Sequence, residues 1–352
     1  MTFGPRHYVP VLKTKRGEKA ALRQMTADLR ERITPLLEIP QRTEKALPLH
    51  LNTAFTDLAA SAALYPRCFL DVREIEADGP TAAATVFQRA ADAGIVFAPV
   101  TGISRTADVA EALSHRQFGL ALRLTRSEFE GGGLNGQLSS FLDARQIQPE
   151  EVDLIVDLGP VEELISEGIA ALTIAFLSEV PEQARWRTLT VSACSFPLGM
   201  GAVERHSHAL VERTEWVAWK ERLYDARFAL ERLPTFSDCA IQHPLGVEGF
   251  NFRVMQVSAA IRYTLEQQWL LVKGEGTRTV PAALQFPELA RRLVYGDLEG
   301  YYAGTAHCFG CTGIKMAADG LPKRGSPGVW RRIGTIHHMS AVMQAIDSLA
   351  WP

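Results

Sequence analysis

The 352-residue sequence contains little that would mark a membrane, secreted or nucleic-acid-binding protein. No apolar run approaches the roughly 18 residues that a membrane span needs, and residues 1–10, MTFGPRHYVP, lack the apolar core of a signal peptide. The formal net charge of −3 gives no overall basicity, so a contact with nucleic acid would have to come from a local patch. The sequence therefore predicts no membrane segment and leaves nucleic-acid binding open.

Cysteines and known catalytic motifs are also scarce. Five cysteines, an odd count in a long chain, fit a reducing cytoplasm better than a disulfide framework. No glycine-rich dinucleotide fingerprint follows the first apolar run, and no nucleophile elbow surrounds Ser192, Cys194 and Ser195. We therefore predict a cytoplasmic protein that is neither a Rossmann-type enzyme nor a triad hydrolase.

What the sequence does contain is one pattern, read eight times: an apolar run with a polar or charged residue near its end. A helical segment follows each of the first seven runs, so each run and its helix form a βα unit. The runs are residues 8–18 (YVPVLKTKRGE), 33–40 (ITPLLEIP), 68–75 (CFLDVREI), 95–103 (IVFAPVTGI), 120–125 (LALRLT), 153–159 (DLIVDLG), 188–195 (TLTVSACS) and 234–244 (PTFSDCAIQHP).

This alternation predicts an α/β protein with a closed (β/α)8 TIM-like barrel rather than an open doubly wound sheet. The seventh helix is expected over residues 203–225. After strand 8 the rhythm breaks, and two β-rich runs predict an inserted β-ribbon near residues 250–274. We predict a barrel domain over residues 1–300 that includes this ribbon, and a C-terminal loop and helix over residues 301–352 that pack on the barrel.

The residues at the strand ends are the main evidence on function. Side chains alternate along a strand, and by this parity Glu38 shares a face with Leu36, Asp71 with Arg73 and Phe69, and Asp238 with Phe236. If these faces point inward, acids and bases meet at the carboxyl-terminal mouth of the barrel, where the active sites of this fold lie. The acids are Glu38, Asp71, Asp157 and Asp238, and the bases are Lys13, Arg73 and Arg123.

Two chemistries fit this set of residues. Carboxylates at neighbouring strand ends suit a hard divalent cation, so Glu38, Asp71 and Asp157 are predicted metal ligands for Mg²⁺ or Mn²⁺. Together with Asp238 they are also the candidate catalytic acids and bases. Lys13, Arg73 and Arg123 suit an anion, and arginine in particular grips phosphate by two hydrogen bonds. The alternative is a salt-bridge network that only plugs the top of the barrel.

A smaller signal is a cluster of histidine and cysteine near the C-terminus. His307, Cys308 and Cys311 form an HCxxC sequence, and His337 and His338 lie downstream. Zinc needs four ligands, and adjacent histidines do not easily bind one ion together. The sequence alone therefore disfavours zinc here.

The same segments carry a family resemblance. The opening YVPVLKTKRGE with ITPLLEIP, then PTFSDCAIQHP, AAIRYTLEQQWLLVKG (residues 259–274) and GTIHHMSAV, resembles the "beta protein" family of bacteria and their phages. The resemblance transfers no catalytic residue, but it implies phage-linked gene neighbourhoods and a role in phage–host conflict. The matching segments include His243 and Arg262, which we add to the predicted ligand-binding residues.

Two functions from different classes follow. The first is a barrel protein that binds an anionic small molecule or nucleotide, with phosphodiesterase-like, metal-assisted hydrolysis as its enzymatic form. The second is a non-catalytic binding component of a phage-defence or phage assembly, with a protein partner encoded in the same gene cluster. For the ribbon we predict that Arg262 faces the site that contains Asp238 and Lys13.

Overall fold

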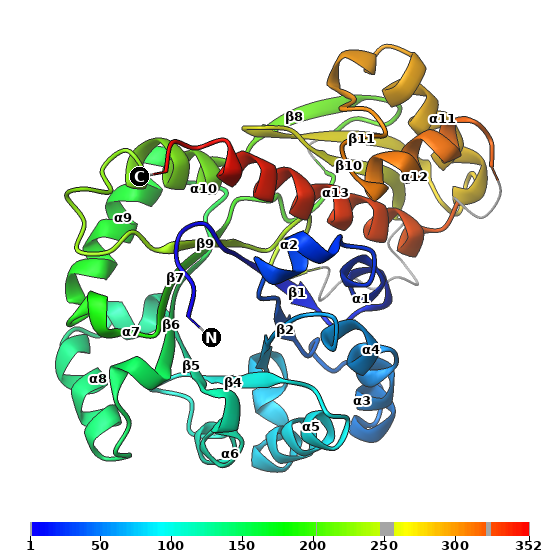
Figure 1. Cartoon of the computed structure of the whole chain (residues 1–352). Coiled ribbons are helices and arrows are strands. Elements are labelled where there is room, and N and C mark those ends of the chain that lie inside the picture. The colour runs from blue at the N-terminus through cyan, green and yellow to red at the C-terminus, as the bar shows by residue number, and fades with distance from the viewer. Residues whose placement is uncertain (1, 202, 247–256, 322–324, 352) are drawn as a thin grey trace. The chain divides into compact units, whose positions relative to one another are not determined.

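The computed structural model describes residues 2–201, 203–246, 257–321 and 325–351, and Figure 1 labels its helices and strands. Contacts within the chain form two compact units. The barrel unit comprises Met1–Lys15, Arg30–Ser195 and Thr214–Cys239, and the second unit comprises Arg16–Leu29, Phe196–Arg213 and Ala240–Pro352. The domain boundary predicted at residue 300 stays a prediction, and residues 250–256 of the predicted ribbon lie outside the described residues.

The barrel unit is built on a closed barrel of parallel strands, which confirms the predicted (β/α)8 fold (Figure 1). Each strand pairs in parallel with the next, and β9 pairs with β1 to close the ring. The strands in barrel order are β1 (Tyr8–Lys13), β2 (Leu36–Glu38), β3 (Cys68–Asp71), β4 (Phe97–Thr101), β5 (Leu120–Thr125), β6 (Val152–Pro160), β7 (Thr188–Cys194) and β9 (Thr235–Asp238).

Helices alternate with these strands along the chain. In chain order they are α1 (Arg16–Leu22), α2 (Ala27–Glu31), α3 (Leu47–Phe55), α4 (Leu58–Ala62), η1 (Arg73–Asp78), α5 (Pro80–Asp92), α6 (Val109–Ser114), η2 (Arg116–Phe118), α7 (Arg126–Glu130), α8 (Leu134–Asp143), η3 (Pro149–Glu151), α9 (Ser166–Glu179), η4 (Gln183–Arg185), α10 (Thr214–Val217) and η5 (Ala218–Leu223).

Helix α5 shows how the sequence specifies this layer. Pro80 stands at the first turn, where its missing N–H costs nothing. Ala83, Val86 and Phe87 recur at helical spacing and are buried, so one face of the helix is apolar. That face packs on the sheet, where the ring of Phe87 stacks on Phe97 of β4 at 6.0 Å.

The second unit contains a three-stranded antiparallel sheet in the order β10-β11-β8. Strands β10 (Ser258–Thr264) and β11 (Gln268–Gly276) form the predicted ribbon. The helix predicted over residues 203–225 is wrong in its first half, because β8 (His208–Glu212) is a strand there. Its side chains alternate between exposed and half-buried along HALVE, the period of a strand rather than a helix.

Helices cover this sheet and complete the core of the second unit. They are α11 (Ala282–Tyr295), η6 (Glu299–Tyr301), α12 (Phe309–Ala318) and α13 (Pro327–Asp347), and α1 packs against α13. Ile261 and Tyr263 of β10 are buried with Phe286, Ile314 and Trp330 of the helices. The ribbon therefore buries one apolar face against the helices, as a half-buried hairpin does.

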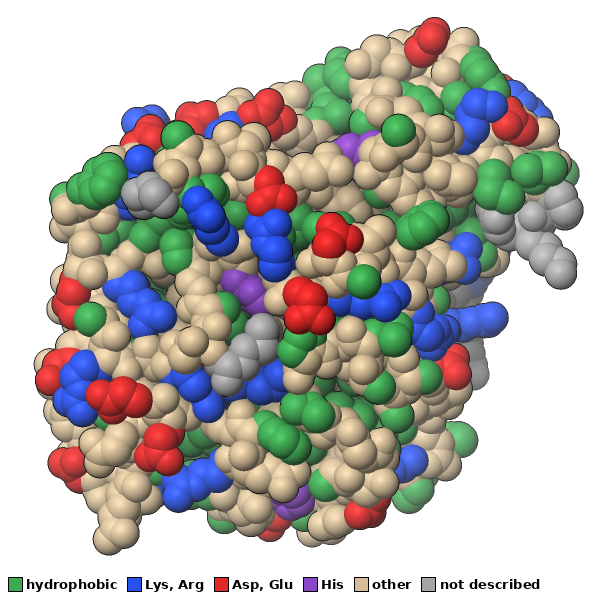
Figure 2. Space-filling view, viewed as in Figure 1, with side chains coloured by type: hydrophobic (Ala, Val, Ile, Leu, Met, Phe, Trp, Pro, Cys, Tyr) green, Lys and Arg blue, Asp and Glu red, His purple; other side chains and the backbone are tan. Residues whose placement is uncertain are grey.

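No helix among the described residues is both long and apolar enough to cross a membrane. On the face that Figure 2 shows, basic and acidic side chains are interspersed.

Candidate functional site

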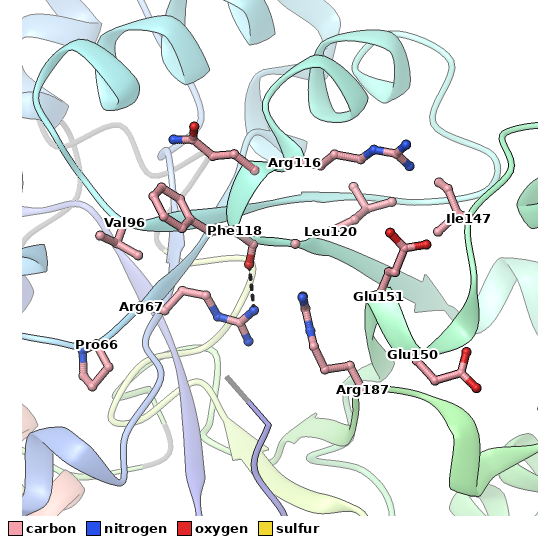
Figure 3. A pocket seen from close by; sticks show the side chains of 12 residues that line it. Pro66, Arg67, Val96, Arg116, Phe118, Leu120, Ile147, Glu150, Glu151 and Arg187 are labelled. Atoms are coloured by element: carbon pink, nitrogen blue, oxygen red, sulfur yellow. Dashed lines mark hydrogen bonds between the residues drawn. The ribbon is translucent and has the colours of Figure 1, made fainter.

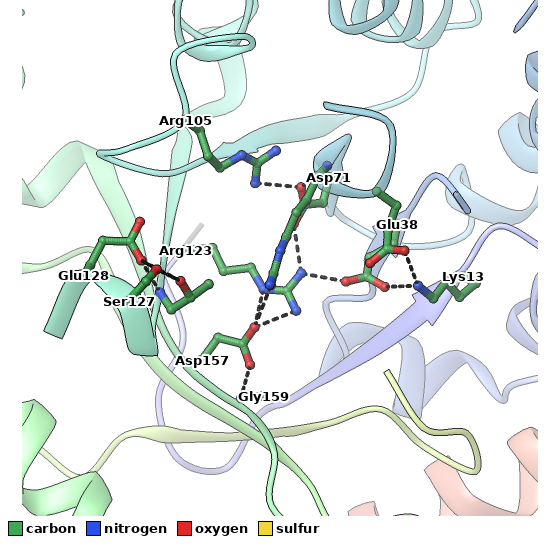
Figure 4. Close-up of polar contacts among 12 residues, drawn as sticks. Lys13, Glu38, Asp71, Arg105, Arg123, Ser127, Glu128, Asp157 and Gly159 are labelled. Carbon is green, nitrogen blue, oxygen red and sulfur yellow. Dashed lines mark hydrogen bonds and ion pairs between the residues drawn. The ribbon is translucent and has the colours of Figure 1, made fainter. Parts of the chain in front are cut away.

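The carboxyl ends of the barrel strands hold a buried ion-pair network, which we call the mouth network (Figure 4). Predicted site residues that meet there are Lys13, Glu38, Asp71, Arg73, Arg123 and Asp157, and residues that the strand-end pattern did not identify are Glu74, Arg105 and Asp108. The predicted faces of β2, β3, β5 and β6 therefore do point inward together.

Arg123 is the centre of the mouth network. Its Nη1 donates to Glu38 Oε1 at 2.7 Å and to Asp71 Oδ2 at 2.9 Å. Its Nε donates to Asp157 Oδ2, also at 2.9 Å. The side chain is 3% exposed, so one buried cation pairs with carboxylates from three other strands.

Asp71 has a second arginine partner. Arg105 Nη1 donates to Asp71 Oδ1 at 2.8 Å, and Asp108 binds the other end of that guanidinium. The backbone N–H of Arg73 also donates to Asp71. Burial works to raise the pKa of Asp71, but the charges of Arg105 and Arg123 outweigh it and hold the pKa below its ordinary value. Asp71 is therefore a permanent anion, poorly suited to act as a general acid.

Lys13 and Arg73 complete the mouth network with different exposures. The Lys13 ammonium lies 3.1 Å from Glu74 and 3.4 Å from Glu38, and its side chain is 2% exposed. Arg73 is 42% exposed, and its Nη1 lies 3.3 Å from Asp157. Arg73 is thus the cation of the mouth network that solvent reaches most easily.

Asp238 lies on the other side of the sheet from the mouth network. It shares its face with Phe236 as predicted, but Phe236 packs against Trp216 and Trp219 of α10 and η5. The Asp238 carboxylate accepts a hydrogen bond of 2.5 Å from Tyr8. Alternation correctly predicts that Asp238 and Phe236 share a face of β9. That face points outward, toward the helices, and not into the barrel as we predicted.

Arg262 and His243 belong to the second unit. Arg262 Nη1 donates to the carbonyl of Ile241 at 2.8 Å, and its guanidinium lies 5.1 Å from the centre of the Phe196 ring. Burial and the neighbouring Arg331 lower the pKa of Arg262 to about 10. His243 is buried and accepts a hydrogen bond from the N–H of Leu245. The predicted facing of Arg262 to Asp238 and Lys13 joins residues of the two units and stays a prediction.

The expected Mg²⁺ or Mn²⁺ ligands, Glu38, Asp71 and Asp157, converge on the Arg123 guanidinium. A divalent ion bound by all three would have to displace that guanidinium. Their convergence on one cation nevertheless shows that this position favours positive charge.

Buried hydroxyls line the lumen side of β7 and β9. Thr188 of β7 donates to Asp153 from that side, and Thr190 and Ser192 follow it at the spacing that keeps a face. Thr190 and Ser192 pair with Thr235 and Ser237 of β9. The hydroxyls of Thr190, Thr235 and Ser237 are buried and have no hydrogen-bond partner among the described residues. Such groups are costly unless water or a ligand satisfies them.

A second polar layer closes the opposite end of the barrel. Asp153 at the start of β6 accepts hydrogen bonds from Arg67 and Arg187. Beside it lies a cavity of about 540 Å³, into which Arg67 and Arg187 point (Figure 3). Its lining residues are Pro66, Arg67, Val96, Arg116, Gln117, Phe118, Gly119, Leu120, Ile147, Glu150, Glu151 and Arg187. These residues precede or begin strands, so the pattern at the carboxyl ends of the strands does not identify them.

Comparison with known proteins gives one family. The family model described as Beta protein matches residues 8–344, nearly the whole chain. No curated protein matches the chain.

Proposed function

The chain belongs to the Beta protein family, and from the geometry of its barrel mouth we propose that it binds an anionic, phosphate-bearing ligand there. The observation that carries the proposal is the contrast between Arg73 and Arg123. Arg123 is 3% exposed and holds three carboxylates, whereas Arg73 is 42% exposed and lies 3.3 Å from Asp157. Arg73 can turn to an incoming anion while Arg123 stays paired with the buried acids.

Two further features support an anion at the mouth. Ser237 pairs with Ser192 at the level of Asp157, and its buried hydroxyl has no partner among the described residues, so a phosphate oxygen would satisfy it. The mouth is also where (β/α)8 proteins bind their ligands. The ligand is proposed to be a small molecule or nucleotide.

The test is a thermal-shift titration of the purified chain with inorganic phosphate, pyrophosphate and nucleoside mono- and triphosphates. A ligand that binds only the folded state at about 100 times its Kd adds roughly 2.7 kcal/mol of stability, which raises the melting temperature. We expect at least one probe to stabilise the wild type and to stabilise Arg73→Ala less. The matched control is Arg222→Ala, since Arg222 is 49% exposed and pairs with Glu167. Equal shifts in both variants would place binding elsewhere.

Metal-assisted phosphoester hydrolysis is the second candidate. It is favoured by the convergence of Glu38, Asp71 and Asp157 on one cationic position. With bis(p-nitrophenyl) phosphate and Mg²⁺ or Mn²⁺, hydrolysis that disappears in Asp157→Asn would support it. Binding without hydrolysis would support the non-catalytic form, a component of a phage-defence or phage assembly with a protein partner. In either form we propose a cytoplasmic setting, consistent with five free cysteines.

A further inference from the structure

Four metal-ligand side chains gather in the second unit, where α12 meets α13 (Figure 1). We call His307, Cys308, Cys311 and His337 the Cys–His cluster. His307, Cys308 and Cys311 stand at the start of α12, and His337 stands in the middle of α13. His337 Nδ1 lies 3.3 Å from Cys311 Sγ and 3.7 Å from Cys308 Sγ.

These separations match a tetrahedral metal site. Zinc binds sulfur at about 2.3 Å and imidazole nitrogen at about 2.0–2.1 Å, so two such ligands at a tetrahedral angle lie about 3.6 Å apart. The two sulfur–nitrogen distances, 3.3 Å and 3.7 Å, fall on either side of that value.

His307 supplies the fourth ligand. One of its ring nitrogens lies within 4.8 Å of the ligand atoms of Cys308 and His337, a group that does not include Cys311, so binding by all four ligands would draw the His307 ring toward Cys311. Its Nε2 is buried and has no hydrogen-bond partner among the described residues. A buried imidazole nitrogen without a partner is unfavourable unless an ion or water satisfies it.

The groups around the Cys–His cluster orient its ligands as they do in metal sites. His337 Nε2 bonds the carbonyl of Thr264 at 2.8 Å, so Nε2 carries the proton and Nδ1 presents its lone pair to the sulfurs. The ring of Tyr263 stacks on His337 at 3.8 Å, which fixes the imidazole plane. The N–H of Cys311 points at Cys308 Sγ from 3.3 Å and would stabilise a thiolate there.

A glycine makes this meeting of helices feasible. A Cβ at Gly310 would lie 2.6 Å from the carbonyl oxygen of Ile333 and 2.9 Å from the N atom of His337. Only glycine therefore lets the first turn of α12 approach α13 closely enough for both sulfurs to reach His337.

We infer that His307, Cys308, Cys311 and His337 bind a zinc ion with tetrahedral geometry, which joins the start of α12 to the middle of α13. With four protein ligands the site is closed, so its role is structural. The site does not require the adjacent histidines, His337 and His338, to bind one ion together. Only His337 belongs to the Cys–His cluster, and His338 bonds the hydroxyl of Thr264 at 2.9 Å.

The test measures metal in protein purified without a histidine tag. Mass spectrometry should find about one zinc per chain, and cobalt substitution should give thiolate-to-metal charge transfer and the visible bands of a tetrahedral site. Cys308→Ser and His307→Ala should lose most of the zinc. Cys68→Ser, which changes a buried thiol of the barrel unit, should keep it.

A second measurement, the melting temperature with a chelator, distinguishes loss of zinc from failure to fold. His307 is only half-buried, so His307→Ala should still fold. A strong chelator should lower the melting temperature of the wild type but not that of folded His307→Ala. Wild type without zinc and without a cobalt–thiolate spectrum would overturn the inference. A Cys308–Cys311 disulfide in zinc-free protein, or full zinc in both variants, would overturn it too.

Discussion

Arg123 on β5 and Asp157 on β6 form a two-pronged ion pair, with Nε and Nη2 of the guanidinium each 2.9 Å from the same carboxylate oxygen. Their side chains are 3% and 5% exposed. A buried pair of this kind depends on both partners, because removal of one leaves the other as an uncompensated charge.

The first prediction concerns this dependence. Arg123→Met should destabilise the protein by about 3–5 kcal/mol, since Glu38, Asp71 and Asp157 lose their shared cation. Arg73→Ala should cost no more than about 1 kcal/mol, because that side chain is 42% exposed. Urea unfolding of the two variants checks both values. Similar small losses would mean that the mouth network contributes little to stability.

The second prediction concerns pH. His7 is buried against Thr34, and burial, followed by the charges of Arg32 and Arg67, lowers the pKa of His7 to about 3. The unfolded chain takes up a proton at about pH 6.5, whereas the folded chain does not. His7 therefore contributes stability that is fully present above about pH 6.5 and falls by up to about 1.4 kcal/mol per pH unit below it.

The comparison is with His7→Gln, which keeps a polar group opposite Thr34. Between about pH 7 and pH 5, its free energy of unfolding should fall less steeply than that of the wild type. Parallel profiles for the two proteins would rule out a buried, neutral His7.

The third prediction concerns Gly119 at the amino-terminal end of the barrel. Its φ is +107°, and a Cβ there would lie 1.9–2.3 Å from the Arg187 guanidinium that binds Asp153. Gly119→Ala should therefore destabilise the protein by at least about 1–3 kcal/mol. The matched control is Gly136→Ala in α8, where a Cβ meets nothing within 4 Å, and it should be neutral or stabilising by up to about 1 kcal/mol.

The sequence predicted the parts of the fold and site that follow from strand periodicity. Alternation along β2, β3, β5 and β6 predicts which side chains near the strand ends share a face. The structure brings together the four charged side chains on those faces, which are Glu38, Asp71, Arg123 and Asp157. Asp238 shows the limit of this pattern, because alternation predicts which residues share a face of a strand but not which face points into the barrel.

Other features have no periodic signal to find. Arg105 and Asp108 reach Asp71 from the segment after β4, and nothing in their spacing indicates that contact. Strand β8 has five residues and is followed in the sequence by the apolar residues of α10. Its partner β11 lies far along the chain. Pairing over such a distance cannot be read from a local pattern.

The central proposal, an anion held at the barrel mouth by Arg73, is tested most directly by calorimetric titration with pyrophosphate. Loss of a hydrogen-bonded charge costs about 1.5–3 kcal/mol, so Arg73→Ala should bind roughly 10- to 150-fold more weakly than wild type. Arg222→Ala, a comparably exposed arginine of the barrel unit, should bind like wild type. The same Kd for wild type and Arg73→Ala, or no binding by wild type, would contradict the proposal.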